Sequence, residues 1–417
     1  MNEEANRCLL CRNARCSSAC PVHTPVPEAM KLYRGGEYDK AAEILFYNNP
    51  FSAITSMVCD WHKLCLGHCV LNAKNAPVRW YEIEKELSGK YLFHASVAAE
   101  DSNNGSVAII GGGPAGITAA LALREKGYGA VIYDSNPEYG GVLRYGIPEF
   151  RLDRKYIDAY ESIIKEAGIV FRGNTTVGKD ISLNRLREQF DAVLIAGGAG
   201  LPRRLNVPGE TEGKVIYALD FLKDPDSYAL GHKVIVVGGG NVTIDASRTA
   251  LRKGCETSVY YRKSFENMPA NLEEVSEAGK EGVEFNVFEV PVEIKEHTVV
   301  MRKCENRTDA DGKISTVMID GTDHEVVYDN IIIAISANVD HGLFGTGMPE
   351  MDDNGNIILE GTQVKSLPGI FLAGDFKLGP KTVVEAVMSA KTAVEEIDTF
   401  LKMKRLKEME KLNTRPD

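Results

Sequence analysis

The chain repeats one local pattern twice: a short apolar run, a glycine-rich turn, a helix-like segment and a second apolar run. A strand that passes through a glycine turn into a helix is typical of folds that bind dinucleotides. The pattern therefore predicts an α/β protein with two Rossmann-like dinucleotide-binding domains. In the first copy we expect a strand at 107–110, a turn at 111–116, a helix at 117–126 and a strand at 130–133. In the second copy we expect a strand at 234–237, a turn at 238–243, a helix at 244–253 and a strand at 258–261.

The first turn has glycines at its first, third and sixth positions. Glycine lets the backbone turn tightly and approach a pyrophosphate, whose charge is favoured by the N-terminus of the following helix. An acidic residue, Asp134, ends the second strand, where its carboxylate can accept hydrogen bonds from a ribose without a 2′-phosphate. We therefore predict FAD at this copy, with contacts from Gly111, Gly113, Pro114, Ala115, Gly116 and Asp134.

The second turn has Thr243 at the third glycine position, and a basic pair follows its second strand. When 131–134 is aligned with 259–262, Arg262 takes the place of the acidic residue and Lys263 follows. A guanidinium can bind a 2′-phosphate through two hydrogen bonds, whereas a carboxylate would repel it. This favours NADPH, with NADH also possible; the alternative is that the basic pair is an exposed strand end. The predicted contacts are Gly238, Gly240, Asn241, Val242, Arg262 and Lys263.

A strand expected at 370–373 leads into Gly374-Asp375, before a helix predicted from Thr382 past Phe400. In flavoenzymes with two dinucleotide folds, such a pair meets the ribityl or pyrophosphate region of the flavin. The N-terminus of the following helix can stabilise negative charge on the reduced ring. We therefore predict FAD contacts from Gly374, Asp375 and Thr382. Because this element follows the second copy, the FAD domain should be discontinuous, with the NADPH domain inserted.

Seven of the nine cysteines lie in the first 69 residues, too densely for all of them to be packing residues. The first run ends in Cys-Pro and partly matches the spacing of a bacterial ferredoxin, although its middle spacer is longer. A structural zinc site is the alternative, but it often has two CxxC pairs, and only one occurs here. Iron–sulfur clusters are favoured because the two nucleotide sites would supply electrons. The seven are Cys8, Cys11, Cys16, Cys20, Cys59, Cys65 and Cys69.

Two 4Fe–4S clusters need eight ligands, so seven cysteines leave one position to another side chain. The candidates from the residues alone are His23, Asp60, His62, His68 and Glu84. The first hundred residues lack strand-like alternation. Apolar residues at helical spacing predict a helix over 26–47, with a break at 35–36. The polar segment 99–105 is a candidate linker to the first dinucleotide fold.

The length of 417 residues is enough for two or three domains. A net charge of −11 argues against nucleic acid as a partner, because phosphate binding needs a basic surface. No apolar run reaches the roughly 18 residues that a membrane helix needs. The first residues lack the pattern of a secretory signal, so a cytoplasmic location is expected, where thiols stay reduced and hold metal more readily than they form disulfides.

Several long motifs, in order, resemble the family of NADPH-dependent glutamate synthase small (beta) subunits. They also resemble the N-terminal, NAD(P)-binding half of dihydropyrimidine dehydrogenase. The resemblance extends from Ala5 to Phe400. It rests on stretches such as EANRCLLCRNARCSSACPVHTPVP, VCDWHKLCLGHCVLN, AIIGGGPAGITAA, YGGVLRYGIPEFRL, VVGGGNVTIDASRTALRKG and IFLAGDFKLGPKTVVEAV.

The resemblance implies that the clusters join the two cysteine runs. One cluster would be held by Cys8, Cys11, Cys16 and Cys69, and the other by Cys20, Cys59, Cys65 and Glu84. It also implies flavin contacts from Gly141, Leu143 and Arg144, and a loop at 267–269 beside the nicotinamide. The chain departs from the family pattern at Lys263, where arginine is common, and at 335–340, which lacks the usual Ile-Gly-x-x-Pro.

The implied function is that of an electron-input subunit. It would oxidise NADPH through FAD and pass electrons through two 4Fe–4S clusters to a catalytic reductase subunit or a ferredoxin-type acceptor. No catalytic acid or base is predicted. The alternatives are a subunit of a flavin-based bifurcating transhydrogenase and a zinc-binding scaffold without catalysis. The predicted domains are a helical iron–sulfur domain at 1–104 and an FAD domain in two parts, at 105–228 and 329–417. The NADPH domain at 229–328 is inserted between these two parts, and the second part includes the C-terminal helix.

Overall fold

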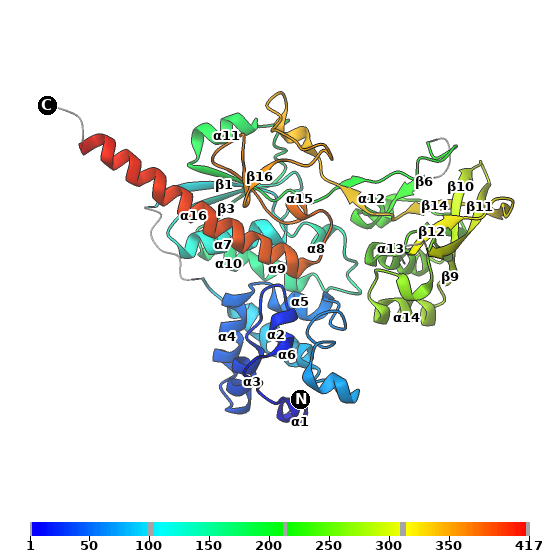
Figure 1. Ribbon diagram of the computed structural model, residues 1–417, viewed down its shortest axis with the longest axis horizontal. Coiled ribbons are helices and arrows are strands. Elements are labelled where there is room, and N and C mark those ends of the chain that lie inside the picture. The colour runs from blue at the N-terminus through cyan, green and yellow to red at the C-terminus, as the bar shows by residue number, and fades with distance from the viewer. Residues whose placement is uncertain (1, 98–103, 212–214, 309–313, 414–417) are drawn as a thin grey trace. The chain divides into compact units, whose positions relative to one another are not determined.

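The computed structural model describes residues 2–97, 104–211, 215–308 and 314–413 (Figure 1). Most of the predicted linker at 99–105 lies outside these residues. The chain forms two compact units, each of which combines segments that are distant in the sequence. Unit 1 comprises Met1–Leu143, Glu149–Ala199 and Val339–Asp417, and unit 2 comprises Arg144–Pro148 and Gly200–Asn338.

The N-terminal part of unit 1 is helical. Its apolar core includes Met30, Leu45, Trp80 and Ile83, each almost fully removed from water. The helix predicted over 26–47 is present as two helices, because Gly36 adopts a positive φ of 76° that ends the first one. The elements are α1 (Asn2–Arg7), α2 (Arg15–Ala19), α3 (Val26–Arg34), α4 (Tyr38–Asn48), α5 (Ser52–Val58), η1 (Val70–Lys74), α6 (Trp80–Tyr91) and η2 (Leu92–His94).

The rest of unit 1 is built on a seven-stranded sheet, whose order is β16-β17-β18-β4-β1-β2-β3. The five strands from β18 to β3 are parallel. The strands are β1 (Ser106–Ile110), β2 (Gly129–Tyr133), β3 (Val170–Arg172), β4 (Ala192–Ile195), β16 (Leu359–Glu360), β17 (Gln363–Val364) and β18 (Ile370–Leu372). Since β18 pairs with β4, two segments on either side of unit 2 complete one sheet.

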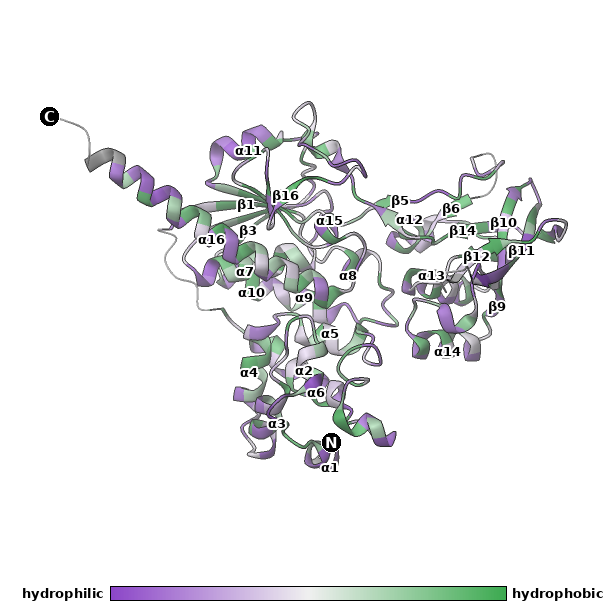
Figure 2. Cartoon of the chain, viewed as in Figure 1, coloured by the Kyte–Doolittle hydropathy of each residue, from purple (hydrophilic) through white to green (hydrophobic). Residues whose placement is uncertain are grey.

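Helices cover both faces of this sheet. In this part of unit 1, the first helix, α7, and the last helix, α16, pack against each other on one face of the sheet, and α11 lies on the other face (Figure 1). The strands are coloured mainly as hydrophobic in Figure 2, whereas the C-terminal part of α16 is mostly hydrophilic. The helices are α7 (Pro114–Glu125), α8 (Val142–Tyr145), α9 (Lys155–Asp158), α10 (Tyr160–Glu166), α11 (Leu183–Gln189), η5 (His341–Phe344), α15 (Asp375–Leu378) and α16 (Val383–Asn413).

The helical part and the sheet part of unit 1 are joined through the loop before α5. The ring of Phe51 stacks on Tyr160 of α10, with centroids 4.6 Å apart. The buried Tyr160 hydroxyl donates to the carbonyl of Pro50 at 2.6 Å. Lys391 of α16 donates to the carbonyl of Asn48 at 2.7 Å. Two elements of the sheet part therefore hold this loop by its backbone oxygens, immediately before the helix that leads to Cys59.

Unit 2 contains a five-stranded parallel sheet in the order β6-β14-β7-β8-β9 and a four-stranded antiparallel sheet. The parallel strands are β6 (Val215–Tyr217), β7 (Lys233–Val237), β8 (Glu256–Tyr261), β9 (Glu284–Val287) and β14 (Asn330–Ile333). The antiparallel strands are β10 (Glu289–Ile294), β11 (Thr298–Thr308), β12 (Ile314–Met318) and β13 (His324–Val327). The helices are α12 (Ala218–Lys223), η3 (Pro225–Ser227), α13 (Asn241–Arg252), η4 (Phe265–Asn267) and α14 (Leu272–Glu281).

The chain enters and leaves unit 2 along a two-stranded antiparallel ribbon, β5 (Leu201–Pro202) and β15 (Ala337–Asn338). The predicted fold class is confirmed: a helical N-terminal part precedes two sheets with parallel strands, and a glycine turn joins β1 to α7 in the first and β7 to α13 in the second. The predicted strands are present to within one or two residues. No helix among the described residues is long and apolar enough to cross a bilayer. The domain boundaries given above stay a prediction.

Candidate functional site

The first glycine turn is built for close approach of backbone to backbone. Gly111 has a positive φ of 105° and donates its N–H to the carbonyl of Tyr133 at 2.7 Å. A side chain at Gly116 would collide with the carbonyl of Gly111, so only glycine allows α7 to start this close to the turn. The helix begins at Pro114, after the N-cap residue Gly113. The N–H groups of its first turn have no acceptor within the helix and follow the turn directly, as the predicted pyrophosphate site requires.

Asp134 is fixed at the end of β2 by hydrogen bonds to both of its oxygens. Oδ2 accepts from the backbone N–H of Gly112 at 2.6 Å. Oδ1 accepts from the backbone N–H of Asn136 at 2.7 Å and from its side-chain amide at 3.1 Å. The carboxylate is buried against the turn. Oδ1 already accepts two hydrogen bonds, whereas Oδ2 accepts one and retains a lone pair for another donor. This carboxylate has the geometry of a ribose acceptor, although Asn136 and the Gly112 contact were not anticipated from the sequence.

Two further predicted flavin contacts lie against the same turn. A side chain at Gly374 would press on the methyl group of Ala115, and Gly374 has a positive φ of 59°. A side chain at Gly141 would lie 2.7 Å from the Cα of Gly113. Three glycines and an alanine from distant segments therefore form one close-packed cradle, in which even a methyl group at Gly141 or Gly374 would collide with its neighbours.

Asp375 and Thr382 lie at the two ends of the connection into α16. Burial raises the pKa of Asp375 to about 6, although its carboxylate accepts a hydrogen bond from the backbone N–H of Lys381. Thr382 donates its N–H and hydroxyl to Glu385, at 2.9 and 2.6 Å, and so caps α16. Leu143 is fully buried, whereas Arg144 belongs to unit 2.

The second turn has the same frame with a looser start to its helix. Gly238 has a φ of 147° and donates to the carbonyl of Tyr260 at 3.0 Å, and Gly240 is the N-cap of α13. Thr243 is fully buried, and its hydroxyl lies 3.3 Å from the carbonyl of Ala334, to which it donates. The Asn241 side chain accepts from the backbone N–H of Asn271 at 2.8 Å, while Val242 opens the first turn of the helix.

The strand register corrects the sequence alignment of the two copies. Ile110 pairs with Tyr133 in the first sheet, and Val237 pairs with Tyr260 in the second. The residue that corresponds to Asp134 is therefore Tyr261, one position before Arg262. The chain spacing contains the same signal, because 18 residues separate position 116 from 134 and also 243 from 261. The alignment over 131–134 was misled by the run of apolar residues, which can be shifted by one without losing its character.

Tyr261 fills the space that the acidic residue leaves. Its ring lies against Gly239, where a Cβ would collide with it, and its hydroxyl donates to the carbonyl of Asn267 at 2.9 Å. Arg262 lies just beyond β8 and is exposed, and Lys263 is partly exposed. The end of the second strand thus carries an aromatic ring and two cations, with no carboxylate at the position of Asp134.

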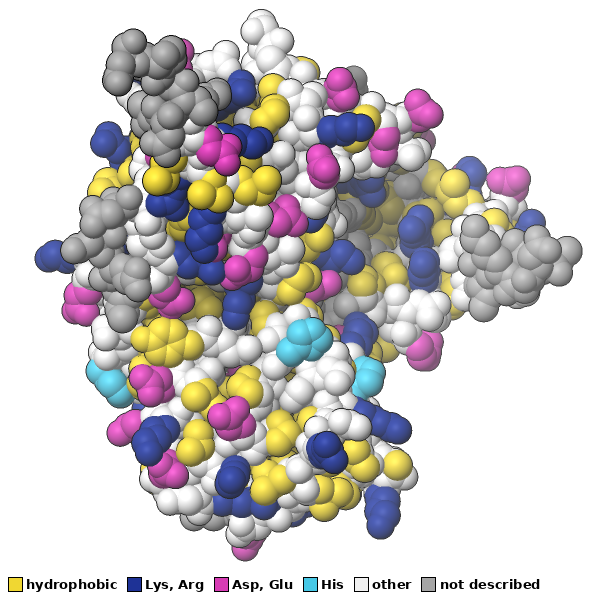
Figure 3. Space-filling view, turned by 60° about the vertical axis from the view of Figure 1, so that its left-hand side comes forward, with side chains coloured by type: hydrophobic (Ala, Val, Ile, Leu, Met, Phe, Trp, Pro, Cys, Tyr) yellow, Lys and Arg dark blue, Asp and Glu magenta, His cyan; other side chains and the backbone are white. Residues whose placement is uncertain are grey.

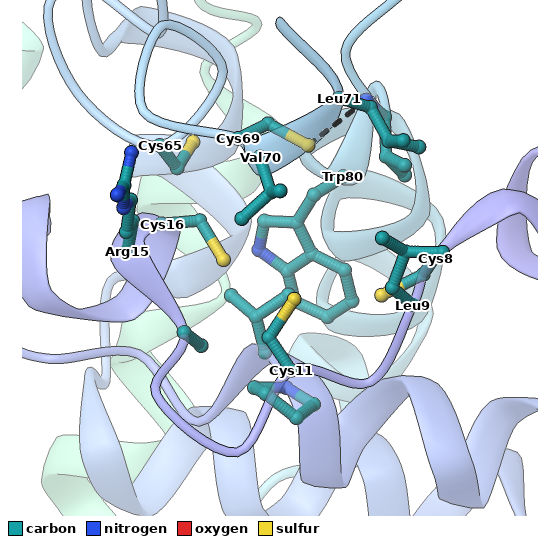
Figure 4. Close-up of a pocket in the computed structure, with 14 residues that line it drawn as sticks. Cys8, Leu9, Cys11, Arg15, Cys16, Cys65, Cys69, Val70, Leu71 and Trp80 are labelled. Atoms are coloured by element: carbon teal, nitrogen blue, oxygen red, sulfur yellow. Dashed lines mark hydrogen bonds between the residues drawn. The ribbon is translucent and has the colours of Figure 1, made fainter. Parts of the chain in front are cut away.

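The N-terminal cysteines surround one another in two groups. Cys8, Cys11, Cys16 and Cys69 line one pocket, with Val70 and the Trp80 indole between them (Figure 4). Burial raises the pKa of Cys8, and the charges of Cys11 and Cys69 raise it further. Burial likewise raises the pKa of Cys16, with contributions from the charges of Cys69 and Cys8. These four thiols are electrostatic neighbours, as the first predicted ligand set requires.

The second group contains the predicted carboxylate. Burial raises the pKa of Cys59 well above its usual value, and the charges of Glu84, Cys65 and Cys20 add to the effect. Cys65 has its pKa raised by burial and then by the charges of Glu84 and Cys20. Burial alone raises the pKa of Glu84 to about 8. Cys65 also lines the pocket of the first group.

This donor set fits iron–sulfur ligation. None of the nine cysteines, all of which the structure describes, forms a disulfide. Within the described ranges, no three His, Cys, Asp or Glu side chains lie close enough together to hold a single metal ion. Among the other candidate ligands, Asp60 forms an ion pair with Lys63 at 2.8 Å, and a ring nitrogen of His68 lies 2.8 Å from the carbonyl of Leu64. A ring nitrogen of His23 lies 3.3 Å from the carbonyl of Ser17.

Comparisons with known proteins identify the class. The family described as pyridine nucleotide-disulphide oxidoreductase matches residues 105–390. The family described as dihydropyrimidine dehydrogenase domain II, 4Fe-4S cluster, matches residues 1–92. The FprA oxidoreductase of Mycobacterium tuberculosis, solved with NADPH, has the same fold, with a TM-score of 0.64 and 20% identity over 73% of this chain and 86% of that chain. The protein is an NAD(P)H-dependent flavin oxidoreductase with an N-terminal 4Fe–4S domain.

Relatives narrow the class further. The small chain of NADPH-dependent glutamate synthase from Azospirillum brasilense is 32% identical over 97% of this chain and 89% of its own length. The Escherichia coli small chain is 33% identical over 96% of this chain and 91% of its own length. The beta subunit of the NADPH-Fe(3+) oxidoreductase of Geobacter sulfurreducens is 32% identical over 93% of this chain and 64% of its own length. The chain belongs to the glutamate synthase small-chain family.

Proposed function

We propose that this protein is the electron-input subunit of a larger reductase. It would take electrons from NADPH and deliver them to a catalytic partner subunit or a ferredoxin-type acceptor. Bound FAD and iron–sulfur clusters would supply the conversion of a two-electron hydride into single electrons. The observation that carries the proposal is the arrangement of seven thiols and one buried carboxylate into two groups, in a chain with two dinucleotide folds.

The residues of unit 1 would hold FAD. The cradle of Gly113, Ala115, Gly141 and Gly374, together with the turn from Gly111 to Gly116, would hold a pyrophosphate against the start of α7. The carboxylate of Asp134 would accept hydrogen bonds from the ribose hydroxyls. The N-terminus of α16, which follows Asp375 and Thr382, would face the flavin ring. Hydride transfer depends on stacking geometry, so none of these residues is assigned as an acid or base.

Unit 2 would bind NADPH through its turn and its two cations. Arg262 is exposed beyond β8, where its guanidinium is free to reach a 2′-phosphate, and Lys263 adds a second positive charge. No carboxylate stands at the strand end to repel that phosphate. Equal kcat/KM for NADH and NADPH would contradict this assignment.

Two clusters would be held by ligands from both cysteine runs. Cys8, Cys11, Cys16 and Cys69 would hold one, and Cys20, Cys59, Cys65 and Glu84 the other. Iron and acid-labile sulfide in anaerobically purified protein test this directly: about eight of each per chain are expected for two 4Fe–4S clusters. Two zinc ions per chain without sulfide would identify a zinc-binding scaffold instead.

The Glu84→Ala variant tests the eighth ligand. We expect the loss of one cluster or a changed EPR spectrum, because Glu84 is the buried carboxylate whose charge acts on both Cys59 and Cys65. An unchanged iron count together with an unchanged EPR spectrum would remove Glu84 from the ligand set. Anaerobic reduction by NADPH, with and without ferredoxin and NAD, separates simple electron input from a bifurcating transhydrogenase, in which ferredoxin would be the low-potential partner.

A further inference from the structure

We propose that an exposed basic face around the first group of cysteines is the docking surface for an acidic electron-accepting protein. We call it the N-terminal basic face and define it by Leu9, Arg12, Arg15, Val70 and Lys74. The inference rests on the proposed function, since it requires electrons to leave through the cysteines beneath this face. It adds a surface and a partner chemistry that neither the fold nor the ligand assignment contains.

The first observation is apolar exposure at the pocket of the cysteines. Leu9 is 59% exposed and Val70 is 42% exposed, and both line the pocket that contains Cys8, Cys11, Cys16 and Cys69. Figure 4 shows both side chains beside these thiols. Apolar side chains that flank a functional centre are suited to removal of water by a partner, whereas isolated exposed ones need no explanation. A partner that covered them would lie directly over the thiols.

The second observation is a set of cations without acidic partners. Arg12, Arg15 and Lys74 are exposed, and none forms an ion pair or hydrogen bond within the described part of the chain. Nearby cations behave differently: Arg7, Lys63 and Arg79 are paired with Glu4, Asp60 and Glu82, at 2.8, 2.8 and 3.2 Å. Three unpaired cations thus lie on the two segments that carry the first group of cysteines, and Arg15 itself lines the pocket. Among the described residues of the N-terminal part, Lys31 on α3 and Lys85 on α6 are likewise exposed and unpaired.

Charge complementarity selects the occupant. The chain as a whole has a net charge of −11, so an acidic protein would be repelled by most of its surface. An acidic docking face would be attracted to the three unpaired cations, which would orient it over the thiols. Such electrostatic orientation raises the association rate of transient electron-transfer complexes and makes it sensitive to salt. Figure 3 shows, at the bottom of the view, basic side chains interspersed with hydrophobic and acidic ones on the N-terminal part of the chain.

The test uses the full chain with an acidic plant-type 2Fe–2S ferredoxin as the probe and basic cytochrome c as the acceptor of opposite charge. The variant R12E/R15E/K74E reverses the three unpaired cations. A matched variant, K165E/K179E/R187E, reverses three exposed cations of the sheet part of unit 1. Iron content and anaerobic bleaching of the visible bands by NADPH are measured first, so that loss of the clusters or of their reduction would count against the proposed function itself.

We expect kcat/KM for ferredoxin to fall about tenfold or more in R12E/R15E/K74E at low ionic strength, through KM, and to fall less than about twofold in the matched variant. Reduction of cytochrome c should be unchanged or faster in the first variant. The single variant R12E serves if the triple variant folds poorly. With clusters intact and reducible, equal losses in the two triple variants, or no loss in either, would overturn the docking surface and leave the proposed function standing.

Discussion

The two dinucleotide folds share a backbone frame and differ at the end of the second strand. In both, the first glycine of the turn has a positive φ and donates its N–H to a backbone carbonyl of the second strand, that of Tyr133 in the first fold and that of Tyr260 in the second. The first fold then places Asp134 under the turn, held by the N–H of Gly112. The second places the ring of Tyr261 there, against Gly239. Under the proposed assignment, the turn would set where a nucleotide lies, and the side chain at the strand end would contribute to which ribose it accepts.

The start of the helix differs as well. Gly116 lies so close to Gly111 that no side chain fits, whereas Thr243 fits and reaches the carbonyl of Ala334. The first helix can therefore approach its ligand more closely than the second. This difference is consistent with the proposed assignment, in which FAD would stay bound in the first fold and NADPH would bind and leave in the second.

The largest expected effect comes from Gly116→Val. Its side chain would collide with the Gly111 carbonyl, so α7 must move away from the turn at a cost of about 3 kcal/mol or more. We expect FAD content to fall below about a tenth of the wild-type value, which absorbance per chain measures. The matched variant Thr243→Val keeps the volume of a side chain that already fits, and should retain FAD. Equal flavin loss in the two variants would remove the contrast between the turns.

The next largest effect is expected from Arg262→Ala. If the guanidinium binds the 2′-phosphate, kcat/KM for NADPH should fall roughly 10- to 100-fold, equivalent to about 1.4–2.8 kcal/mol, while kcat/KM for NADH stays within about threefold. Steady-state rates with a tetrazolium dye measure both. The same loss with both nucleotides would show that Arg262 supports the fold and does not distinguish the phosphate.

Asp134→Asn should have a smaller effect on the first fold. The amide has a single acceptor atom, so either Gly112 or Asn136 loses an acceptor for its N–H, at about 1–3 kcal/mol. The Kd for FAD should rise about tenfold, as measured by titration of the apoprotein. Asn136→Ala is the control, because it keeps both backbone hydrogen bonds, and a comparable rise in that variant would refute this account.

The smallest effect is expected from Tyr261→Phe. It removes one hydrogen bond to the carbonyl of Asn267, worth about 1 kcal/mol, and keeps the ring over Gly239. The unfolding midpoint should fall slightly, and kcat/KM for NADPH should stay within about threefold. A fall in kcat/KM for NADPH of more than tenfold would mean that the Tyr261 hydroxyl contacts the nucleotide. The side chains at both strand ends would then bind nucleotide directly, and the contrast between Asp134 and Tyr261 would be lost.

Local pattern was enough to predict most of the fold. Apolar runs and glycine turns located β1, β2 and β18 of the first sheet and β7 and β8 of the second, and helical spacing located the helix over 26–47 with its break at 35–36. The strand end of the second fold was misplaced by one residue, because an apolar run can slide along its partner without changing its character. Only the backbone pairing of Val237 with Tyr260 settles the register.

Contacts between distant segments could not be predicted from local pattern. Nothing in the sequence around Gly374 indicates that it lies against Ala115, or that Phe51 stacks on Tyr160. The grouping of the cysteines was reached through family resemblance, and its electrostatic basis, with Glu84 beside Cys59 and Cys65, is visible only in three dimensions.

The two-stranded ribbon of β5 and β15 has a consequence for engineering. The chain leaves the flavin fold and returns to it along neighbouring antiparallel strands, with Leu201 opposite Asn338 and Pro202 opposite Ala337. The residues between these strands can therefore be treated as an exchangeable cassette whose two ends are already side by side. A nucleotide-binding cassette of another specificity could be spliced in at these two strands, with the flavin sheet left uncut.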